Sequence, residues 1–251
     1  MLLLKEFIVF SLALILALLI LTGVSDSDQT ESSTRLNSTT TNSEVFPQTT
    51  LSEKFNYYLN LILNNSIDGQ KVRSEINSLK NNFEREFLTA MMEKRSGNYE
   101  EYFKRLFALS ENLPAYPLFY EELTLSAKVS DNLNAIAKLL NSNKDKSSSP
   151  YYLYLEAMYY SRSGKSSEGV ERLEKLVSKG FNSKEVYFQL ANGYRITGDY
   201  DKSYLNIIEA ENLCEDDDPF IAKITNLKGT IFFLSGEYEK AKVEYERALK
   251  R

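Results

Sequence analysis

A short helix–turn–helix pattern recurs along the chain, and its period constrains the fold more than any other feature of the sequence. In the clearest copy, Leu190 to Leu213, one helical pattern ends at Thr197-Gly198-Asp199-Tyr200 and a second one begins. The corresponding turns are centred on residues 97, 131, 164, 198 and 236, so they lie 34, 33, 34 and 38 residues apart. A period of this length predicts an all-α solenoid of stacked antiparallel helix pairs.

The turn residue itself is chemically consistent from copy to copy. Four of the five turns carry glycine there, and the fifth carries Asp131. A residue just past a helix end often adopts a left-handed backbone conformation, which glycine takes without strain and which Asp tolerates better than most residues. The pattern therefore predicts a helix end at Gly97, Asp131, Gly164, Gly198 and Gly236.

Two further columns of residues recur in register with the turn. Seven positions before it the residues are small, and nine positions after it they are large. A small residue on one helix and a large one on its neighbour allow close antiparallel packing. The small set is Ala90, Thr124, Ala157, Ala191 and Gly229, and the large set is Leu106, Leu140, Leu173, Ile207 and Tyr245.

These residues resemble the pattern of the tetratricopeptide repeat family, in which a small residue and an aromatic precede the turn glycine and large and small apolar residues follow it. The resemblance covers about Phe83 to Arg251 and is weaker in the early repeats. There Tyr102 and Ile136 replace the small residue expected five positions after the turn residue, and Ser166 replaces the aromatic, so we expect altered packing angles. The fullest copies carry Ala191, Tyr194, Gly198, Tyr200, Ile207 and Ala210, then Gly229, Phe232, Gly236, Tyr238, Ala241, Tyr245 and Ala248.

The repeat register divides the second part of the chain. Apolar residues at helical spacing on both sides of Ile67-Asp68-Gly69 predict a divergent helical hairpin over residues 51–82. After it we expect five repeat units, at about 83–116, 117–149, 150–182, 183–218 and 219–251.

The first 50 residues predict a targeting or anchoring segment and a linker, not a folded unit. Residues 1–24 contain an uncharged apolar run, Phe7 to Val24, whose length lies between a secretory signal and a membrane span. Lys5 precedes this run and Asp26 and Asp28 follow it, an order that favours a cytoplasmic N-terminus. A retained anchor and a signal cleaved after Ser25 both stay open. Residues 25–50 are rich in Ser and Thr and predict a flexible linker.

The resemblance implies a concave groove, lined by the first helix of each pair, that binds a protein or peptide. Counting 10, 6 and 3 residues back from the turn gives the expected lining residues of the last three repeats. These are Tyr154, Met158 and Ser161, then Phe188, Asn192 and Arg195, then Asn226, Thr230 and Phe233.

Two other interpretations of these positions stay open. Tyr154 and Phe188 would equally suit burial against a neighbouring helix. One subset of the family grips a C-terminal carboxylate with basic and amide side chains. Asn192 and Lys223 fit that arrangement loosely, but Phe188 stands where a cation would be needed.

Composition argues against several other classes of function. The chain has no His and one Cys, Cys214, which we expect to be a small buried apolar residue at a helix end, so the usual metal and acid–base groupings are closed off. A net charge of −5 disfavours nucleic-acid binding. The acidic run Glu215 to Asp218, followed by Pro219, resembles helix-start chemistry more than a cation site. We expect no enzyme and no cofactor.

The sequence thus predicts a membrane-tethered or secreted extracytoplasmic scaffold that serves protein assembly or chaperoning. The alternative is a structural part of a larger envelope complex that associates through the end of the stack, with a homodimer as one form of it. Both readings make the partner a protein.

Overall fold

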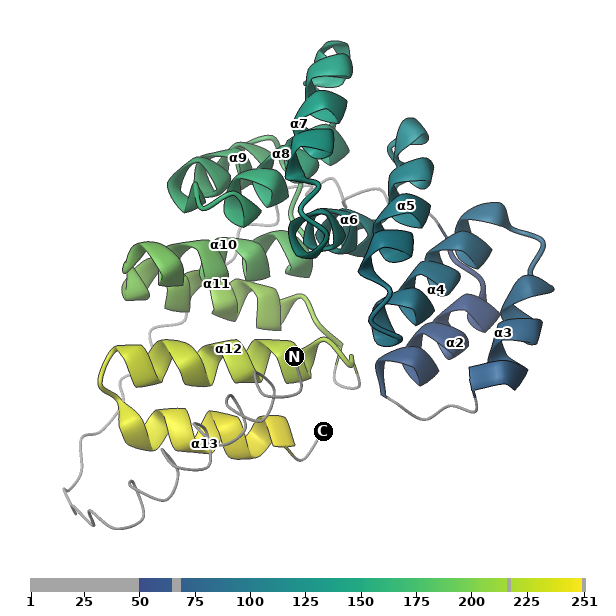
Figure 1. Cartoon of the computed structure of the whole chain (residues 1–251). Coiled ribbons are helices and arrows are strands. Elements are labelled where there is room, and N and C mark those ends of the chain that lie inside the picture. The colour runs from purple at the N-terminus through teal and green to yellow at the C-terminus, as the bar shows by residue number, and fades with distance from the viewer. Residues whose placement is uncertain (1–49, 65–68, 216–217, 250–251) are drawn as a thin grey trace. The chain divides into compact units, whose positions relative to one another are not determined.

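The computed structural model describes residues 50–64, 69–215 and 218–249, and these residues form twelve α-helices and two short 3-10 helices with no strand (Figure 1). The predicted all-α class is confirmed. The described residues divide into two compact units, an N-terminal unit up to Leu213 and a C-terminal unit from Cys214 onward.

The N-terminal unit holds ten of the α-helices and the C-terminal unit holds two. The first ten, with the two 3-10 helices, are α2 (Glu53–Leu63), α3 (Gly69–Asn77), α4 (Asn82–Arg95), α5 (Tyr99–Leu109), η1 (Ser110–Asn112), α6 (Pro117–Val129), α7 (Leu133–Ser142), η2 (Lys144–Lys146), α8 (Pro150–Arg162), α9 (Ser166–Ser178), α10 (Lys184–Thr197) and α11 (Tyr200–Asn212). The C-terminal unit contains α12 (Ile221–Leu234) and α13 (Tyr238–Leu249).

Helix pairs are the building blocks of both units. In the N-terminal unit α4 packs on α5, α8 on α9 and α10 on α11, and α5 with α6, α6 with α8 and α9 with α10 connect one pair to the next (Figure 1). Each pair leaves one apolar face uncovered, and the neighbouring pair covers it. The N-terminal unit is therefore a solenoid of stacked helix pairs, and α12 with α13 forms one further pair.

The turn residues behave as predicted. Gly97, Gly164, Gly198 and Gly236 have φ between +77° and +86°, and Asp131 has φ of +58°. After α10, the Gly198 amide donates to the Arg195 carbonyl at 3.3 Å and the Asp199 amide donates to the Tyr194 carbonyl at 3.0 Å. These two bonds satisfy carbonyls that the end of a helix leaves without a partner.

The column of small residues allows the predicted close approach. A Cβ placed on Gly229 would lie 2.9 Å from the ring of Tyr245, the large residue of the same repeat. In another repeat the hydroxyl of Ser203 donates to the Ala191 carbonyl across the pair at 2.7 Å. The approach at Gly229 leaves no room for a larger side chain there.

Tyr102, where a small residue was expected, is accommodated by the next repeat. Its side chain is fully buried, and its hydroxyl donates to the backbone carbonyl of Glu122 on α6 at 3.1 Å and to the Glu122 carboxylate. Burial, followed by the charge and the hydrogen bond of Glu122, raises the pKa of this hydroxyl far above its ordinary value. Tyr102 thus ties α5 to α6 as a permanent donor, and the altered packing angle stays a prediction.

The two helices before the first repeat, α2 and α3, both contact α4, and aromatic rings and one carboxylate join α2 to that repeat. Phe55 on α2 lies 5.8 Å from Phe87 on α4 and 5.9 Å from Tyr116 before α6, measured between ring centroids. The amide and the hydroxyl of Ser52 both donate to the carboxylate of Glu84 at 2.8 Å. These contacts bury Phe55 completely and fix α2 on the first repeat.

Two local expectations need correction. The helix after the acidic run begins at Ile221, so Pro219 precedes it, and Asp218 accepts a hydrogen bond from the Phe220 amide at 2.9 Å. Cys214 is only partly buried, because it lies in the connection after α11 and not within a helix that packs on the core.

The predicted apolar segment at residues 1–24 and most of the predicted linker at residues 25–50 lie outside the described residues. Within the part of the chain that the structure describes, no helix is long and apolar enough to cross a membrane.

Candidate functional site

Two of the three predicted lining residues on α8 lie in the core, and the third, Ser161, is partly exposed. Tyr154 has no exposed surface and Met158 has 2 %, so neither offers a surface to a partner. The Tyr154 hydroxyl donates to a carboxylate oxygen of Glu121 on α6 at 2.8 Å, and its ring lies 6.3 Å from that of Tyr120. The expectation of an accessible position was wrong for these two residues: α6 of the preceding repeat holds Tyr154, and Met158 is buried as well.

The predicted residues on α10 remain partly exposed and share one helix face. Phe188, Asn192 and Arg195 are spaced by four and three residues, which is the spacing of a single stripe. Glu185 extends the stripe by three residues toward the start of the helix, for a total length of about 15 Å. α10 therefore presents an aromatic ring, an amide and a guanidinium in order along one side, whereas the Glu185 carboxylate has a buried oxygen and its charge acts on Tyr154.

Two members of the stripe on α10 hold each other in place. The Nε and Nη2 atoms of Arg195 donate to the Oδ1 atom of Asn192 at 3.3 and 2.9 Å. The amide is neutral, so this contact orients the guanidinium without cancelling its charge. Arg195 is thereby preorganised for an anion or a carbonyl group.

The remaining predicted residues belong to the C-terminal unit. Asn226 is exposed, and Phe233 is partly exposed, with its ring 5.5 Å from that of Tyr238. Thr230 accepts a hydrogen bond from the Tyr245 hydroxyl at 3.2 Å. Lys223, which fitted the carboxylate arrangement loosely, lies in this unit as well, with its ammonium 5.2 Å from the centre of the Phe220 ring.

A polar group that the sequence analysis missed links α4 and α5 to the middle of α6. The Nζ atom of Lys94 lies 2.6 Å from the carboxylate of Glu122 and 5.7 Å from the centre of the Tyr102 ring. Lys94 stands three positions before its turn residue, as Arg195 does. The same count applied to the early repeats would have found it.

Charges from three helices converge on buried tyrosine hydroxyls in the N-terminal unit. Burial raises the pKa of Tyr154 well above its ordinary value, Glu121 and Glu185 raise it further, and Arg162 opposes them. Burial also raises the pKa of Tyr116, with Glu185 as the next largest cause. Both hydroxyls stay protonated at neutral pH, and the Tyr154 hydroxyl donates to Glu121.

Other kinds of site are less well supported. In the described ranges, no group of three or more His, Cys, Asp or Glu residues is arranged to hold a metal ion. A shallow recess of about 500 Å³ lies where α4 begins and α5 ends, lined by Asn82, Phe83 and Leu109 among others. No predicted groove residue lines it, so the recess and the stripe on α10 are different places.

Paired helices, left-handed turn residues and small residues at the helix contacts define the chain as a helical repeat protein. Its fold is that of the tetratricopeptide repeat. No family model matches the chain, and no curated protein matches its sequence.

Solved structures share this fold at low sequence identity. A tetratricopeptide repeat protein from Parabacteroides merdae aligns with a TM-score of 0.53 and 17% identity over 78% of this chain and 78% of that one. NprR in complex with its cognate peptide NprX aligns with a TM-score of 0.50 and 12% identity over 78% of this chain, and the match spans 65% of the NprR chain. At these identities the likeness establishes the fold.

Proposed function

We propose that this chain is a protein-interaction scaffold that binds a peptide, or a segment of another protein, on the first helices of its repeats. The observation that carries the proposal is the stripe on α10, where Phe188, Asn192 and Arg195 stand together on one partly exposed face. Aromatic and arginine side chains supply much of the binding energy in protein interfaces. NprR, whose fold is similar, is solved with a peptide bound, which supports this assignment.

Each group of the stripe has a role in such an interface. Phe188 offers apolar area to a side chain of the partner. The amide nitrogen of Asn192 is available to donate to a backbone carbonyl, since the oxygen of this side chain serves Arg195. Arg195 adds a cation whose orientation is already fixed, which lowers the entropy lost on binding.

The location belongs to the same proposal. The uncharged run from Phe7 to Val24, followed by a Ser- and Thr-rich linker, supports a membrane-anchored or secreted scaffold outside the cytoplasm that serves protein assembly or chaperoning. Protease treatment of intact cells tests it. If the repeats are digested only after the cytoplasmic membrane is lysed, they lie in the cytoplasm and the assignment is contradicted.

Capture of partners tests the binding function. The full chain is compared with variants carrying Phe188→Ala or Arg195→Ala, and both should lose crosslinked partners by about tenfold or more. Leu205→Ala is a matched control, because Leu205 is 64 % exposed on α11, a second helix. Unchanged capture by both stripe variants, with circular dichroism showing an intact fold, would contradict the proposal.

A second candidate function rests on α13, which presents an exposed apolar surface. Val243 is 62 % exposed and Tyr238 is 48 % exposed on this helix. Tyr245 is less suited to an interface, since its ring packs against Gly229 and its hydroxyl bonds to Thr230. If the chain associates through α13, Val243→Lys should dissociate the assembly in sedimentation experiments, and a monomer at high micromolar concentration would exclude this candidate.

A further inference from the structure

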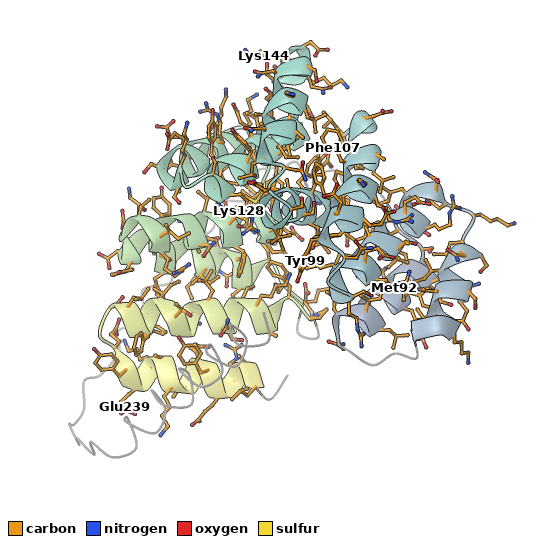
Figure 2. All side chains as sticks on the ribbon, viewed as in Figure 1. Met92, Tyr99, Phe107, Lys128, Lys144 and Glu239 are labelled. Carbon is orange, nitrogen blue, oxygen red and sulfur yellow. The ribbon has the colours of Figure 1, made fainter. Side chains whose placement is uncertain are left out.

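Basic residues end the first helix of every repeat pair in the N-terminal unit. Lys94, Lys128, Arg162 and Arg195 occupy the last turns of α4, α6, α8 and α10, where Lys128 is labelled in Figure 2. A cation in the last turn complements the helix dipole, but that effect would favour first and second helices equally. The second helices α5, α7 and α11 have no basic residue there, and α9 alone has one, Lys175.

The four cations occupy equivalent places in successive repeats. Lys94, Lys128 and Arg195 stand three positions before the turn residue, and Arg162 stands two before it. Stacking of repeats brings equivalent positions to the same side of the unit. Two of the four are tied to a common neighbour, because Lys94 lies over the Tyr102 ring and the charge of Arg162 counteracts the raised pKa of the same Tyr102 hydroxyl.

Three of these cations lack a carboxylate partner within the described part of the chain. Lys94 is paired with Glu122, whereas Lys128 is exposed and forms no ion pair. Arg195 bonds only to the neutral amide of Asn192. The Nε atom of Arg162 is buried without a hydrogen-bond partner, although the side chain as a whole is partly exposed. The charge of Arg162 acts on the same Tyr154 hydroxyl as the charges of Glu121 and Glu185, although no ion pair joins them in the described ranges.

We propose that Lys128, Arg162 and Arg195, which we call the basic strip, bind internal Asp or Glu side chains of an extended acidic segment of a partner protein. This inference rests on the proposed peptide-binding function and names the chemistry of the peptide. α6 packs on α8, packed helices lie about 8–10 Å apart, and an extended chain advances about 3.3 Å per residue. Between Lys128 and Arg162 the partner therefore presents an acidic side chain about every third residue. α10 packs on α9, so the step from Arg162 to Arg195 is at least as long.

The placement of the three cations on successive repeats favours an acidic peptide over two other ligands, a single terminal carboxylate and a nucleic acid. One terminal carboxylate cannot reach cations on three successive repeats, so a C-terminal residue alone does not account for the strip. A nucleic acid would carry its negative charge continuously past Glu121 and Glu185, which are partly exposed toward the starts of α6 and α10. A peptide can alternate acidic with neutral or basic residues and so avoid that repulsion.

The test measures fluorescence anisotropy of the purified full chain with a peptide of about 12 residues that carries Asp at every third position and an amidated C-terminus. An otherwise identical peptide with Asn in place of Asp should bind at least about tenfold more weakly in low salt. Replacing Lys128, Arg162 and Arg195 together by Gln should weaken binding of the acidic peptide by about 30-fold, or about threefold for each lost pair.

A matched control removes two exposed cations from second helices. Lys138→Gln combined with Lys175→Gln changes the net charge of α7 and α9 and should leave the affinity within about twofold. If the triple variant does not fold, Lys128→Gln with Arg195→Gln, which leaves the buried atom of Arg162 in place, should still weaken binding by about tenfold.

Four results would overturn the inference: equal binding of the Asp and Asn peptides, equal losses in the strip and control variants, binding only when the peptide ends in a free carboxylate, or equally tight binding of single-stranded DNA. Failure of the charge inference is distinguishable from failure of the proposed function. If the Asn peptide binds as well as the Asp peptide and Phe188→Ala abolishes both, the stripe on α10 still binds peptides and only the acidic specificity is wrong.

Discussion

Gly193 offers the sharpest test of how neighbouring repeats pack. It lies inside α10 and faces Val170 on α9, the second helix of the preceding pair. A Cβ at Gly193 would lie 2.6 Å from the Cγ2 atom of Val170. Apolar carbon atoms ordinarily approach to about 3.5–4.0 Å, so Gly193→Ala would create an overlap of about 1 Å.

Two opposing effects set the magnitude for Gly193→Ala. Val170 is buried and β-branched, with one strongly preferred rotamer in a helix, so it relieves the overlap only by a poor rotamer or a shift of α9. Such overpacking costs about 1–3 kcal/mol. Alanine inside a helix gains about 0.5–1 kcal/mol over glycine. Gly193→Ala should therefore lower the free energy of unfolding by about 1 kcal/mol.

The decisive measurement is a double-mutant cycle. Urea unfolding of the full chain, followed by circular dichroism, is compared for the wild type, Gly193→Ala, Val170→Ala and the double variant. In the Val170→Ala background the overlap is gone, so Gly193→Ala should stabilise by about 0.5–1 kcal/mol. If Gly193→Ala has the same effect in both backgrounds, within about 0.3 kcal/mol, the close approach of α9 and α10 is refuted.

Three further substitutions test the turn, the link between repeats and the response to acid. Gly198→Ala should lower the free energy of unfolding by about 1–2 kcal/mol in chemical denaturation, because φ at this position is +86° and alanine is strained there. Nothing lies within 4 Å of an added Cβ, so a steric clash does not contribute. Tyr102→Phe should cost about 1–3 kcal/mol, since the buried Glu122 loses a donor. Glu93 is partly desolvated, which alone would raise its pKa, but Arg73 lowers this pKa below the ordinary 4.5. The stabilisation from Glu93 is therefore complete above the unfolded-state pKa of this carboxyl and is lost as the pH falls through its folded-state pKa. In Glu93→Gln the free energy of unfolding should therefore fall less steeply as the pH is lowered.

Each of these predictions has its own control. Gly198→Asn should cost less than Gly198→Ala, because Asn adopts the left-handed conformation more readily, and equal losses would point to a cause other than backbone strain. Tyr57→Phe removes a hydroxyl from a ring that is 59 % exposed and should be near neutral. A variant at Glu93 that loses stability equally at pH 7 and at pH 3 would show that the Arg73 pair contributes no pH dependence.

The parts of the fold that were predicted correctly depend on chemistry within one repeat. Gly198 is needed because the backbone there is left-handed, and the rule concerns one residue and its own helix. The pairing of Gly229 with Tyr245 depends only on two helices joined by a short turn. Such local rules repeat with the period of the sequence, so one well-formed repeat is enough to align all the others.

The exposure of individual side chains was not predictable in the same way, because it depends on the residue at the equivalent position of a neighbouring repeat. Tyr154 and Phe188 both stand 10 positions before their turn residues, yet the first is buried and the second is partly exposed. Tyr154 is held by Glu121, the residue at that position one repeat earlier. A single repeat therefore does not reveal which of its aromatic residues is available to a partner.

The same dependence explains why the basic strip is a better guide to function than the aromatic positions are. An aromatic ring gains free energy from burial, so the fold itself accounts for Tyr154. A cation at a helix end is favoured by the helix dipole, but its charge is neutralised only where a carboxylate meets it, as Glu122 meets Lys94. Lys128 and Arg195 have the same register as Lys94, but in the described part of the chain they have no such carboxylate. The cations that the fold does not neutralise at equivalent positions of successive repeats are therefore the residues that we propose bind a partner. Because they are positively charged, the partner segment is acidic.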